Sequence, residues 1–343
     1  MILIGLLIIA IGAFCQSSCY VPINKIKSWS WESYWIVQGV FAWLILPFLG
    51  ALLAVPAGHS LTELFTADQS FNIWMTILFG ALWGVGGLTF GLSMRYLGVA
   101  LGQSIALGTC AGLGTIMGPV LLNIFFPEND PLSQLTMAVI LGVVVTLIGI
   151  AIIGIAGSMK ASSLSEEEKK AAVKDFNFPK GITIALLAGF MSGCFNVGLE
   201  FGSGINFGSL TPDIYKTLPA TLLVTLGGFV TNAVYCFYQN HKNRTWGDYA
   251  NRAVIGNNLL FCLLAGALWY SQFFGLALGK GFLTDSPTLM TLSFCILMAL
   301  NVVFSNVWGI ILKEWKGCSS KTITVLVIGI AVLIVSCFLP QLI

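Results

Sequence analysis

The chain has 343 residues, of which 57% are hydrophobic and only 9% charged, and its formal net charge is +2. A soluble domain could not cover so much apolar surface with so few charges, so this composition excludes that class and predicts a polytopic membrane protein. The small net charge also gives no indication of nucleic-acid binding, because the basic residues are spread over short segments.

Ten apolar segments are long enough to cross a membrane. A bilayer core of about 30 Å requires roughly 20 apolar residues per helix. The expected spans are residues 2–21, 34–55, 73–94, 99–124, 134–157, 181–204, 218–239, 254–278, 289–311 and 322–339. We therefore predict an all-α membrane protein with ten transmembrane helices.

The basic residues fall almost entirely on one side of these spans. Fourteen of the 16 Lys and Arg residues follow odd-numbered spans: Lys25, Lys27, Arg95, Lys160, Lys169, Lys170, Lys174, Lys180, Lys242, Arg244, Arg252, Lys313, Lys316 and Lys321. Only Lys216 and Lys280 fall on the other side. The positive-inside rule then predicts a multi-pass protein of the cell inner (cytoplasmic) membrane, with both termini outside.

The one long charged stretch, residues 158–180, lies near the middle of the chain. It divides the sequence into residues 1–157 and 181–343, with five expected helices each, and is predicted to be a cytoplasmic linker. Aligning the halves places Gly5 on Gly181 and Phe14 on Phe190. Because five is an odd number, the second half must enter the membrane from the opposite side, which predicts two inverted five-helix repeats typical of secondary transporters.

The stretch 79–118 carries glycines in pairs four residues apart. The pairs are Gly80 and Gly84, Gly87 and Gly91, Gly98 and Gly102, Gly108 and Gly112, and Gly114 and Gly118. Small residues at this spacing share one helix face and allow close packing in lipid, so we expect the packed centre of the protein here, in two helices joined by almost no loop. Glycine faces serve contacts within one chain or between chains, so the oligomeric state stays open.

Four sequence blocks carry a resemblance that covers essentially the whole length. They are KIKSWSWESYW at 25–35, LFGALWGVGGLTFGLSMRYLG at 78–98, WYSQFF at 269–274 and LKEW at 312–315. In these blocks the chain resembles the bacterial L-rhamnose–proton symporter family of the drug/metabolite transporter superfamily. The resemblance implies ten helices in two inverted repeats, and import of a 6-deoxyhexose by alternating access, driven by the proton gradient.

A neutral sugar is bound by amides and hydroxyls that pair with its hydroxyl groups, and by an aromatic face for its apolar side. Gln272 is the first candidate, because it lies three residues from Trp269 and so on roughly the same helix face. The expected substrate-binding residues are Gln272, Trp269, Tyr270, Trp83, Asn196, Gln16 and Gln103. Two alternatives stay open: the amides hydrogen-bond neighbouring helices, and Trp83 and Trp269 are wedges against glycine faces rather than two sides of a sugar site.

Proton coupling requires a group that titrates inside the protein. Glu200 is the only acid within an expected span, and burial there would raise its pKa towards the working range, so it is the expected proton-coupling residue. The alternative is that Glu200, near the outer end of its span, simply reaches water. Tryptophans 29, 31, 35 and 43 around Glu32 fit an interfacial aromatic belt, with a sugar platform as the alternative.

The sequence predicts no cofactor and no metal site. Its nine cysteines lack metal-ligand spacing, and His59 and His241 lie in expected loops. An intramembrane enzyme is disfavoured because the spans offer neither a nucleophile with a base nor paired carboxylates. The expected partners are a small neutral sugar, protons and the lipid bilayer. The competing interpretation is a transporter of the same fold for another sugar or small metabolite, coupled differently or not at all.

Overall fold

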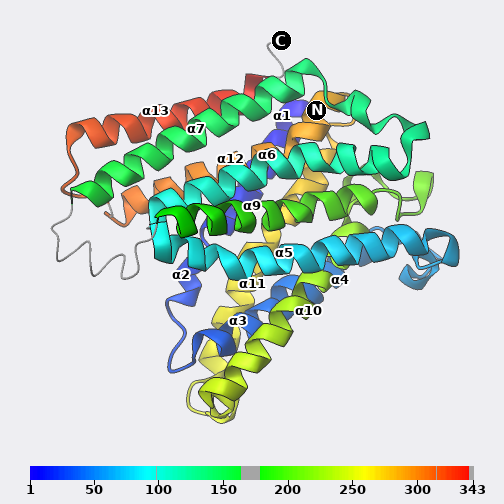
Figure 1. Cartoon of the computed structure of the whole chain (residues 1–343). Helices are drawn as coiled ribbons and strands as arrows, with labels where there is room; N and C mark the ends of the chain where they lie inside the picture. The colour runs from blue at the N-terminus through cyan, green and yellow to red at the C-terminus, as the bar shows by residue number, and fades with distance from the viewer. Residues whose placement is uncertain (98, 164–177, 314, 340–343) are drawn as a thin grey trace. The chain divides into compact units, whose positions relative to one another are not determined.

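The computed structural model describes residues 1–97, 99–163, 178–313 and 315–339 (Figure 1). Within these residues all regular structure is helical, and ten segments are long and apolar enough to cross a membrane. The segments are Ile2–Ile23, Trp31–Leu52, Ala67–Ser93, Gly102–Phe125, Met137–Lys160, Pro179–Phe201, Asp213–Asn243, Ile255–Gly281, Pro287–Ile311 and Ser320–Phe338. The prediction of an all-α protein with ten membrane-spanning helices is thereby confirmed.

Individual helices divide these segments further. The α-helices are α1 Ile2–Ser17, α2 Tyr20–Ile23, α3 Trp31–Gly39, α4 Leu46–Leu52, α5 Ser70–Leu97, α6 Val99–Phe125, α7 Met137–Ser162, α9 Phe178–Phe201, α10 Leu218–Asn243, α11 Ile255–Gly281, α12 Pro287–Ile311 and α13 Ser320–Phe338. Short 3-10 turns lie in the connections, including η7 Asp213–Tyr215 and η8 Trp246–Ala250. As expected, α5 and α6 are joined with almost no loop.

Helices extend into both ends of the predicted linker, residues 158–180. Helix α7 continues through Lys160 to Ser162, and α9 begins at Phe178. A helix can run past the membrane surface into water without losing its backbone hydrogen bonds, so hydropathy does not mark where it ends. Residues 164–177 of the predicted linker lie outside the described residues.

The second span changes its helical geometry halfway. Between α3 and α4 lies a π-helical segment, η1 Val40–Ile45, which contains Trp43. Pro47 follows four residues after Trp43 and has no backbone N–H, so the carbonyl of Trp43 lacks its usual helical donor. Wider π turns of this kind often occur at functional sites.

The chain forms two compact units. The first unit comprises Met1–Gly84 and Gly198–Thr284, and the second comprises Val85–Val197 and Asp285–Ile343. The divisions fall inside α5 and α9, so each unit takes helices from both predicted five-helix halves.

In the first unit, glycines bring helix backbones together. Helix α1 lies along α11, and a Cβ on Gly12 would stand 2.7 Å from the carbonyl oxygen of Ser271. Gly84 lies on Gly228 of α10, where an added Cβ would stand 2.9 Å from the Gly228 oxygen. These contacts require a residue without a side chain, which confirms the packing role predicted for Gly84.

In the second unit, α7 lies beside α6 and α13 (Figure 1). A Cβ on Gly149 of α7 would stand 2.6 Å from the Leu333 side chain of α13, and the Thr146 hydroxyl donates to the Ser336 hydroxyl over 3.0 Å. The expectation that every glycine pair packs closely is wrong for Gly87 and Gly91, which have no described atom within 4 Å of an added Cβ. Glycine spacing marks a helix face, but the fold decides whether a neighbour covers that face.

Candidate functional site

Five tryptophans of the first unit form a continuous tryptophan cluster: Trp31, Trp35, Trp43, Trp83 and Trp269. Trp43 contacts Trp83 and Trp269 edge-on, with ring centroids 5.9 and 5.8 Å apart, and Trp83 and Trp269 are 5.6 Å apart. Trp35 contacts Trp43 at 5.7 Å, and Trp31 stacks on Trp35 at 5.3 Å. Three helical segments, η1, α5 and α11, thus meet at one aromatic centre.

Glycines seat two of these rings. The ring of Trp83 lies directly on Gly228 of α10, and the ring of Trp43 lies on Gly39, where an added Cβ would stand 2.5 Å from a ring carbon. Because Trp83 and Trp269 contact each other, a sugar does not fit between them in this conformation. Trp83 therefore packs against a glycine face in this conformation, and both expected alternatives for the pair, a packing role and two sides of a sugar site, stay open.

Three polar atoms on the helical segments that carry the tryptophan cluster are buried without a hydrogen-bond partner among the described residues. They are Gln38 Oε1, Trp43 Nε1 and Tyr270 OH, on side chains no more than 6% exposed. The Tyr270 hydroxyl lies against Gly50 of α4. A buried polar group without a partner is destabilising, so these three atoms are candidates for hydrogen bonds to a ligand. Gln69, Asn72 and Thr217 of the same unit also bury an atom without a partner among the described residues.

Asn232 of α10 hydrogen-bonds both to the tryptophan cluster and to the backbone of its own helix. Its Oδ1 accepts a hydrogen bond from Trp35 Nε1 over 2.9 Å, and its Nδ2 donates to the Gly228 carbonyl over 2.8 Å. The amide therefore orients a ring of the tryptophan cluster and holds the backbone on which Trp83 lies. Asn232 matches the expectation that membrane amides bond neighbouring helices.

The remaining predicted sugar ligands are divided between the two units. Gln272 is buried in α11, facing Gly12 of α1, and Gln16 lies one turn beyond Gly12 and is half-buried. Asn196 and Gln103 belong to the second unit; the Asn196 Nδ2 donates to the Gly114 carbonyl over 2.9 Å, while its Oδ1 has no partner among the described residues.

Glu200 forms an ion pair that the sequence did not predict. Its Oε1 lies 3.7 Å from Lys280 Nζ, with the two side chains 20% and 11% exposed. Lys280 was expected in an outer loop, but α11 extends to Gly281 and carries it inside the unit. The assignment of Lys280 to a loop is thus wrong, and the physical reason is its carboxylate partner, since buried charges are tolerated when they are paired.

A second polar group lies at the other end of the first unit. The Glu32 Oε1 accepts hydrogen bonds from Asn243 Nδ2 and the Thr245 hydroxyl, both over 2.9 Å. Asp248 Oδ2 accepts from the backbone and the hydroxyl of Ser30 over 2.8 and 2.9 Å. Burial raises the pKa of Asp248, but hydrogen bonds from Ser30 and Ser33 outweigh it and hold the pKa below its ordinary value.

The predicted aromatic belt is only partly present. Trp31 is exposed, as a belt residue should be, but Trp43 is 2% exposed and Trp35 bonds inward to Asn232. Trp43 was expected in the aromatic belt, with a sugar platform as the alternative, and sequence reasoning missed only the pairing of Lys280 with Glu200. Pro47 was the available signal for Trp43, because a proline four residues downstream disturbs the helix at that position.

Comparison with known proteins gives a consistent result. Residues 1–342 match the family described as L-rhamnose-proton symport protein (RhaT). An L-rhamnose-proton symporter from Yersinia pestis (strain Pestoides F) is 32% identical over 347 residues, which cover 98% of this chain and 96% of the relative. The symporter of the same description from Yersinia pseudotuberculosis serotype O:1b (strain IP 31758) has the same identity and coverage.

Proposed function

Because the chain belongs to the L-rhamnose-proton symport protein family, we propose that it imports L-rhamnose or a related deoxy sugar together with protons. The family places it among membrane transporters rather than enzymes. The observation that carries the proposal is the match to symporters over nearly the full length of both chains. The ten membrane-length helices agree with transport by alternating access, in which the site opens to one side of the membrane at a time.

The tryptophan cluster and its buried polar neighbours are the sugar-binding site in this proposal. Trp43, Trp83 and Trp269 supply aromatic faces for the apolar side of a deoxy sugar. Gln38 and Tyr270 supply polar atoms that lack partners among the described residues and can pair with sugar hydroxyls. Because the three rings contact each other without sugar, binding must separate them, which couples occupancy to a movement of η1, α5 or α11.

Further amides complete the proposed sugar site. Gln272 and Gln16 lie on the facing sides of α11 and α1, one turn apart along the close contact at Gly12. Asn196 and Gln103 belong to the second unit and stay predictions as substrate-binding residues. The free Oδ1 of Asn196 supports its inclusion, because only its Nδ2 is used in helix packing.

Glu200 is the proposed proton-coupling residue, with Lys280 as its counter-charge. A proton on Glu200 would remove the negative charge that faces Lys280 over 3.7 Å. A largely buried ammonium group without its carboxylate is strongly disfavoured, so protonation would favour a conformation in which Lys280 reaches water or another partner. Protonation of Glu200 would in this way shift the equilibrium between conformations of the protein.

The two inverted repeats, residues 1–157 and 181–343, remain part of the proposal. In these repeats α1 corresponds to α9, and α5 corresponds to α11. The contact between α1 and α11 is therefore equivalent to the contact between α9 and α5. Both pairs make close glycine contacts: Gly12 with Ser271 in the first unit, and Gly86 with Ser192 in the second, where an added Cβ would stand 2.5 Å from the Ser192 nitrogen. The excess of basic residues on one side supports insertion in the inner membrane with both termini outside.

Uptake by proteoliposomes tests the proposal directly. Purified protein is reconstituted, and labelled L-rhamnose, L-fucose and D-glucose are supplied with and without an inward proton gradient. We expect gradient-driven accumulation of L-rhamnose above its external concentration. Equilibration without accumulation would contradict proton coupling, and accumulation of a different sugar would contradict the substrate. Absence of flux for all three sugars in folded protein would contradict the proposed function as a whole.

A further inference from the structure

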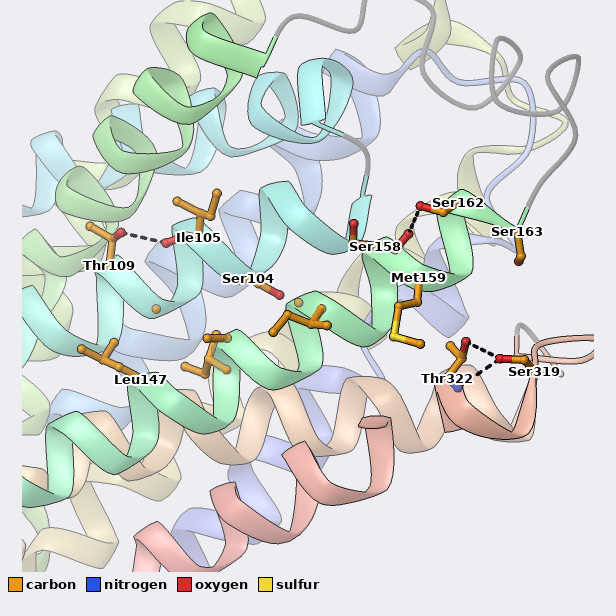
Figure 2. Close-up of a pocket in the computed structure, with 15 residues that line it drawn as sticks. Ser104, Ile105, Thr109, Leu147, Ser158, Met159, Ser162, Ser163, Ser319 and Thr322 are labelled. Atoms are coloured by element: carbon orange, nitrogen blue, oxygen red, sulfur yellow. Dashed lines mark hydrogen bonds between the residues drawn. The ribbon is translucent and has the colours of Figure 1, made fainter. Parts of the chain in front are cut away.

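The second unit contains a groove of about 860 Å³ between α6 and α7 that reaches the first turn of α13 (Figure 2). It lies entirely within that unit and takes no residue from the tryptophan cluster. The groove is therefore separate from the sugar-binding site proposed above.

The two ends of the groove differ in chemistry. One end is formed by the apolar side chains of Ile105, Leu147 and Ile150. The other end gathers hydroxyl groups, as Figure 2 shows: Ser158, Ser162, Ser163, Ser319 and Thr322. An elongated ligand with an apolar tail and a polar head matches this order.

The length of the groove matches one leaflet of a membrane. Leu147 and Ser162 are 15 residues apart on α7, which corresponds to about 22 Å along a helix. Half of a bilayer, including its headgroup region, is about 20–22 Å thick. The membrane-length part of α7 is Met137–Lys160, so Leu147 lies near its middle and Ser162 just beyond its end. This placement agrees with a groove that spans one leaflet.

Cations flank the hydroxyl end. Lys160 follows Met159 of the groove wall, and its Nζ lies 4.8 Å from the ring centroid of Trp315, near the start of α13. Lys321 lies between the groove residues Ser319 and Thr322. These charges complement a phosphate group, and each lysine near an anionic lipid is expected to strengthen binding about fivefold.

We propose that this groove binds an anionic phospholipid. One acyl chain lies between α6 and α7, and the phosphate lies at the hydroxyl end, where Lys160 and Lys321 supply positive charge. The serine and threonine side chains give this end a polar lining, in which the Ser162 and Ser163 hydroxyls donate to backbone carbonyls of α7. The site is independent of the sugar, so it holds whether or not the proposed transport function is correct.

Native mass spectrometry of the full-length protein, titrated with phosphatidylglycerol or phosphatidylethanolamine, tests the proposal. Gly108 is the position to alter, because a Cβ there would stand 3.6 Å from both Ile150 and Leu147, an ordinary contact distance. Gly108→Leu therefore fills the groove without a backbone clash. We expect the wild type to retain phosphatidylglycerol in preference to phosphatidylethanolamine, and Gly108→Leu to lose that retention.

A second variant tests the charges without changing the packing. Lys160→Gln combined with Lys321→Gln is expected to weaken phosphatidylglycerol binding about 25-fold. Lys25→Gln, an exposed lysine of the first unit that is expected on the same side of the membrane, is the matched control and should bind as the wild type does.

Four results would overturn the proposal. Equal retention of both lipids would show that the site does not recognise an anionic headgroup. Unchanged retention by folded Gly108→Leu would show that the lipid does not bind in this groove. A dimer without lipid that Gly108→Leu dissociates would assign the groove to a second copy of the chain. Should Gly108→Leu not fold, the double lysine variant decides, and wild-type affinity in that variant would overturn the site.

Discussion

The two units bury different kinds of polar side chain. The described residues of the first unit bury charges and amides, among them Glu32, Gln38, Asn232, Asn240, Asn258, Gln272 and Lys280. Those of the second unit bury mainly hydroxyls, with the amides Asn196 and Asn301. A hydroxyl can satisfy its single donor on its own helix, as Thr115 does with the Ala111 carbonyl over 2.9 Å. An amide has more polar atoms to satisfy, and Asn232 uses both its own helix and Trp35 of another helix.

This difference indicates a division of labour. Among the described residues, most buried polar atoms without a hydrogen-bond partner lie in the first unit, which also holds the tryptophan cluster and the ion pair of Glu200 with Lys280. Glycines pack helices together in both units. Because unpartnered and charged groups destabilise a membrane protein, their concentration in one unit favours function as the reason they are kept. The following predictions test this contrast.

The largest effect is expected at the ion pair. Glu200→Gln should abolish gradient-driven accumulation of sugar while exchange of sugar across the membrane continues, because the variant can bind sugar but no longer carries the proton. Glu128→Gln, an exposed glutamate of the second unit, is the matched control and should accumulate sugar normally. Full accumulation by Glu200→Gln would end the assignment.

Loss of folding is the alternative explanation for an inactive Glu200→Gln, since it leaves Lys280 buried without its carboxylate. The double variant Glu200→Gln with Lys280→Met removes both charges and should recover the unfolding temperature without recovering accumulation. If accumulation also returned, Glu200 would be a structural partner of Lys280 and not a proton carrier.

The next largest effect is expected at glycines, where substitution by alanine should destabilise a packed helix face but not an open one. Gly228→Ala in the first unit forces a methyl group into the ring of Trp83 and should lower the free energy of unfolding by about 1–3 kcal/mol. Gly87→Ala in the second unit meets no described atom within 4 Å, and should raise it by about 0.5–1 kcal/mol through helix propensity. Unfolding in detergent measures both, and equal effects would contradict the packing described for α10.

Substitution of Gln38 is expected to weaken sugar binding without changing the stability of the protein. Gln38→Met removes an oxygen that has no partner among the described residues, so the free energy of unfolding should hardly change. If this oxygen binds sugar, the KM for L-rhamnose should rise about tenfold, the value of one lost hydrogen bond of about 1.4 kcal/mol. An unchanged KM would remove Gln38 from the site.

Asn196→Ala is the comparison from the second unit. It removes a hydrogen bond of 2.9 Å to the Gly114 carbonyl and should cost about 1 kcal/mol or more of stability. A stability loss for Gln38→Met that matched this one would show that both amides act in helix packing.

The smallest effect is a pH dependence in the connection before α11. The pKa of Asp248 is held below its ordinary value in the folded state, so its contribution to stability is present above that ordinary value and is lost as the pH falls through the folded pKa. Asp248→Asn should therefore cost about 1 kcal/mol near neutral pH and progressively less in acid. Thermal unfolding at several pH values measures the difference in stability between the wild type and Asp248→Asn. This difference should not increase as the pH falls.

The span assignments succeeded because hydropathy is a local property. A helix in lipid satisfies all its backbone hydrogen bonds within one segment, so each of the ten spans can be recognised from its own residues. Trp269 and Gln272 were candidates for the same reason, since residues three apart lie on roughly the same helix face. They lie in the first unit, and Trp83 contacts Trp269.

Contacts between distant segments could not be predicted in this way. Trp43 was assigned to a membrane interface, but it contacts Trp83 and Trp269, residues far from it in the sequence. Lys280 was assigned to a loop, although Glu200 accommodates it inside the unit. Gly84 and Gly87 read alike in the sequence, yet only Gly84 is covered by a neighbouring helix.

The sequence by itself determined the class of the protein, its ten spans and its family, because apolar length, charge distribution and a long series of matching residues are all readable along the chain. Only the tertiary structure decided which aromatic rings meet, which polar atoms are left without partners and which charges are paired. Those properties depend on which helix faces are brought within a few ångströms of each other, and helical periodicity specifies a face without specifying what lies against it.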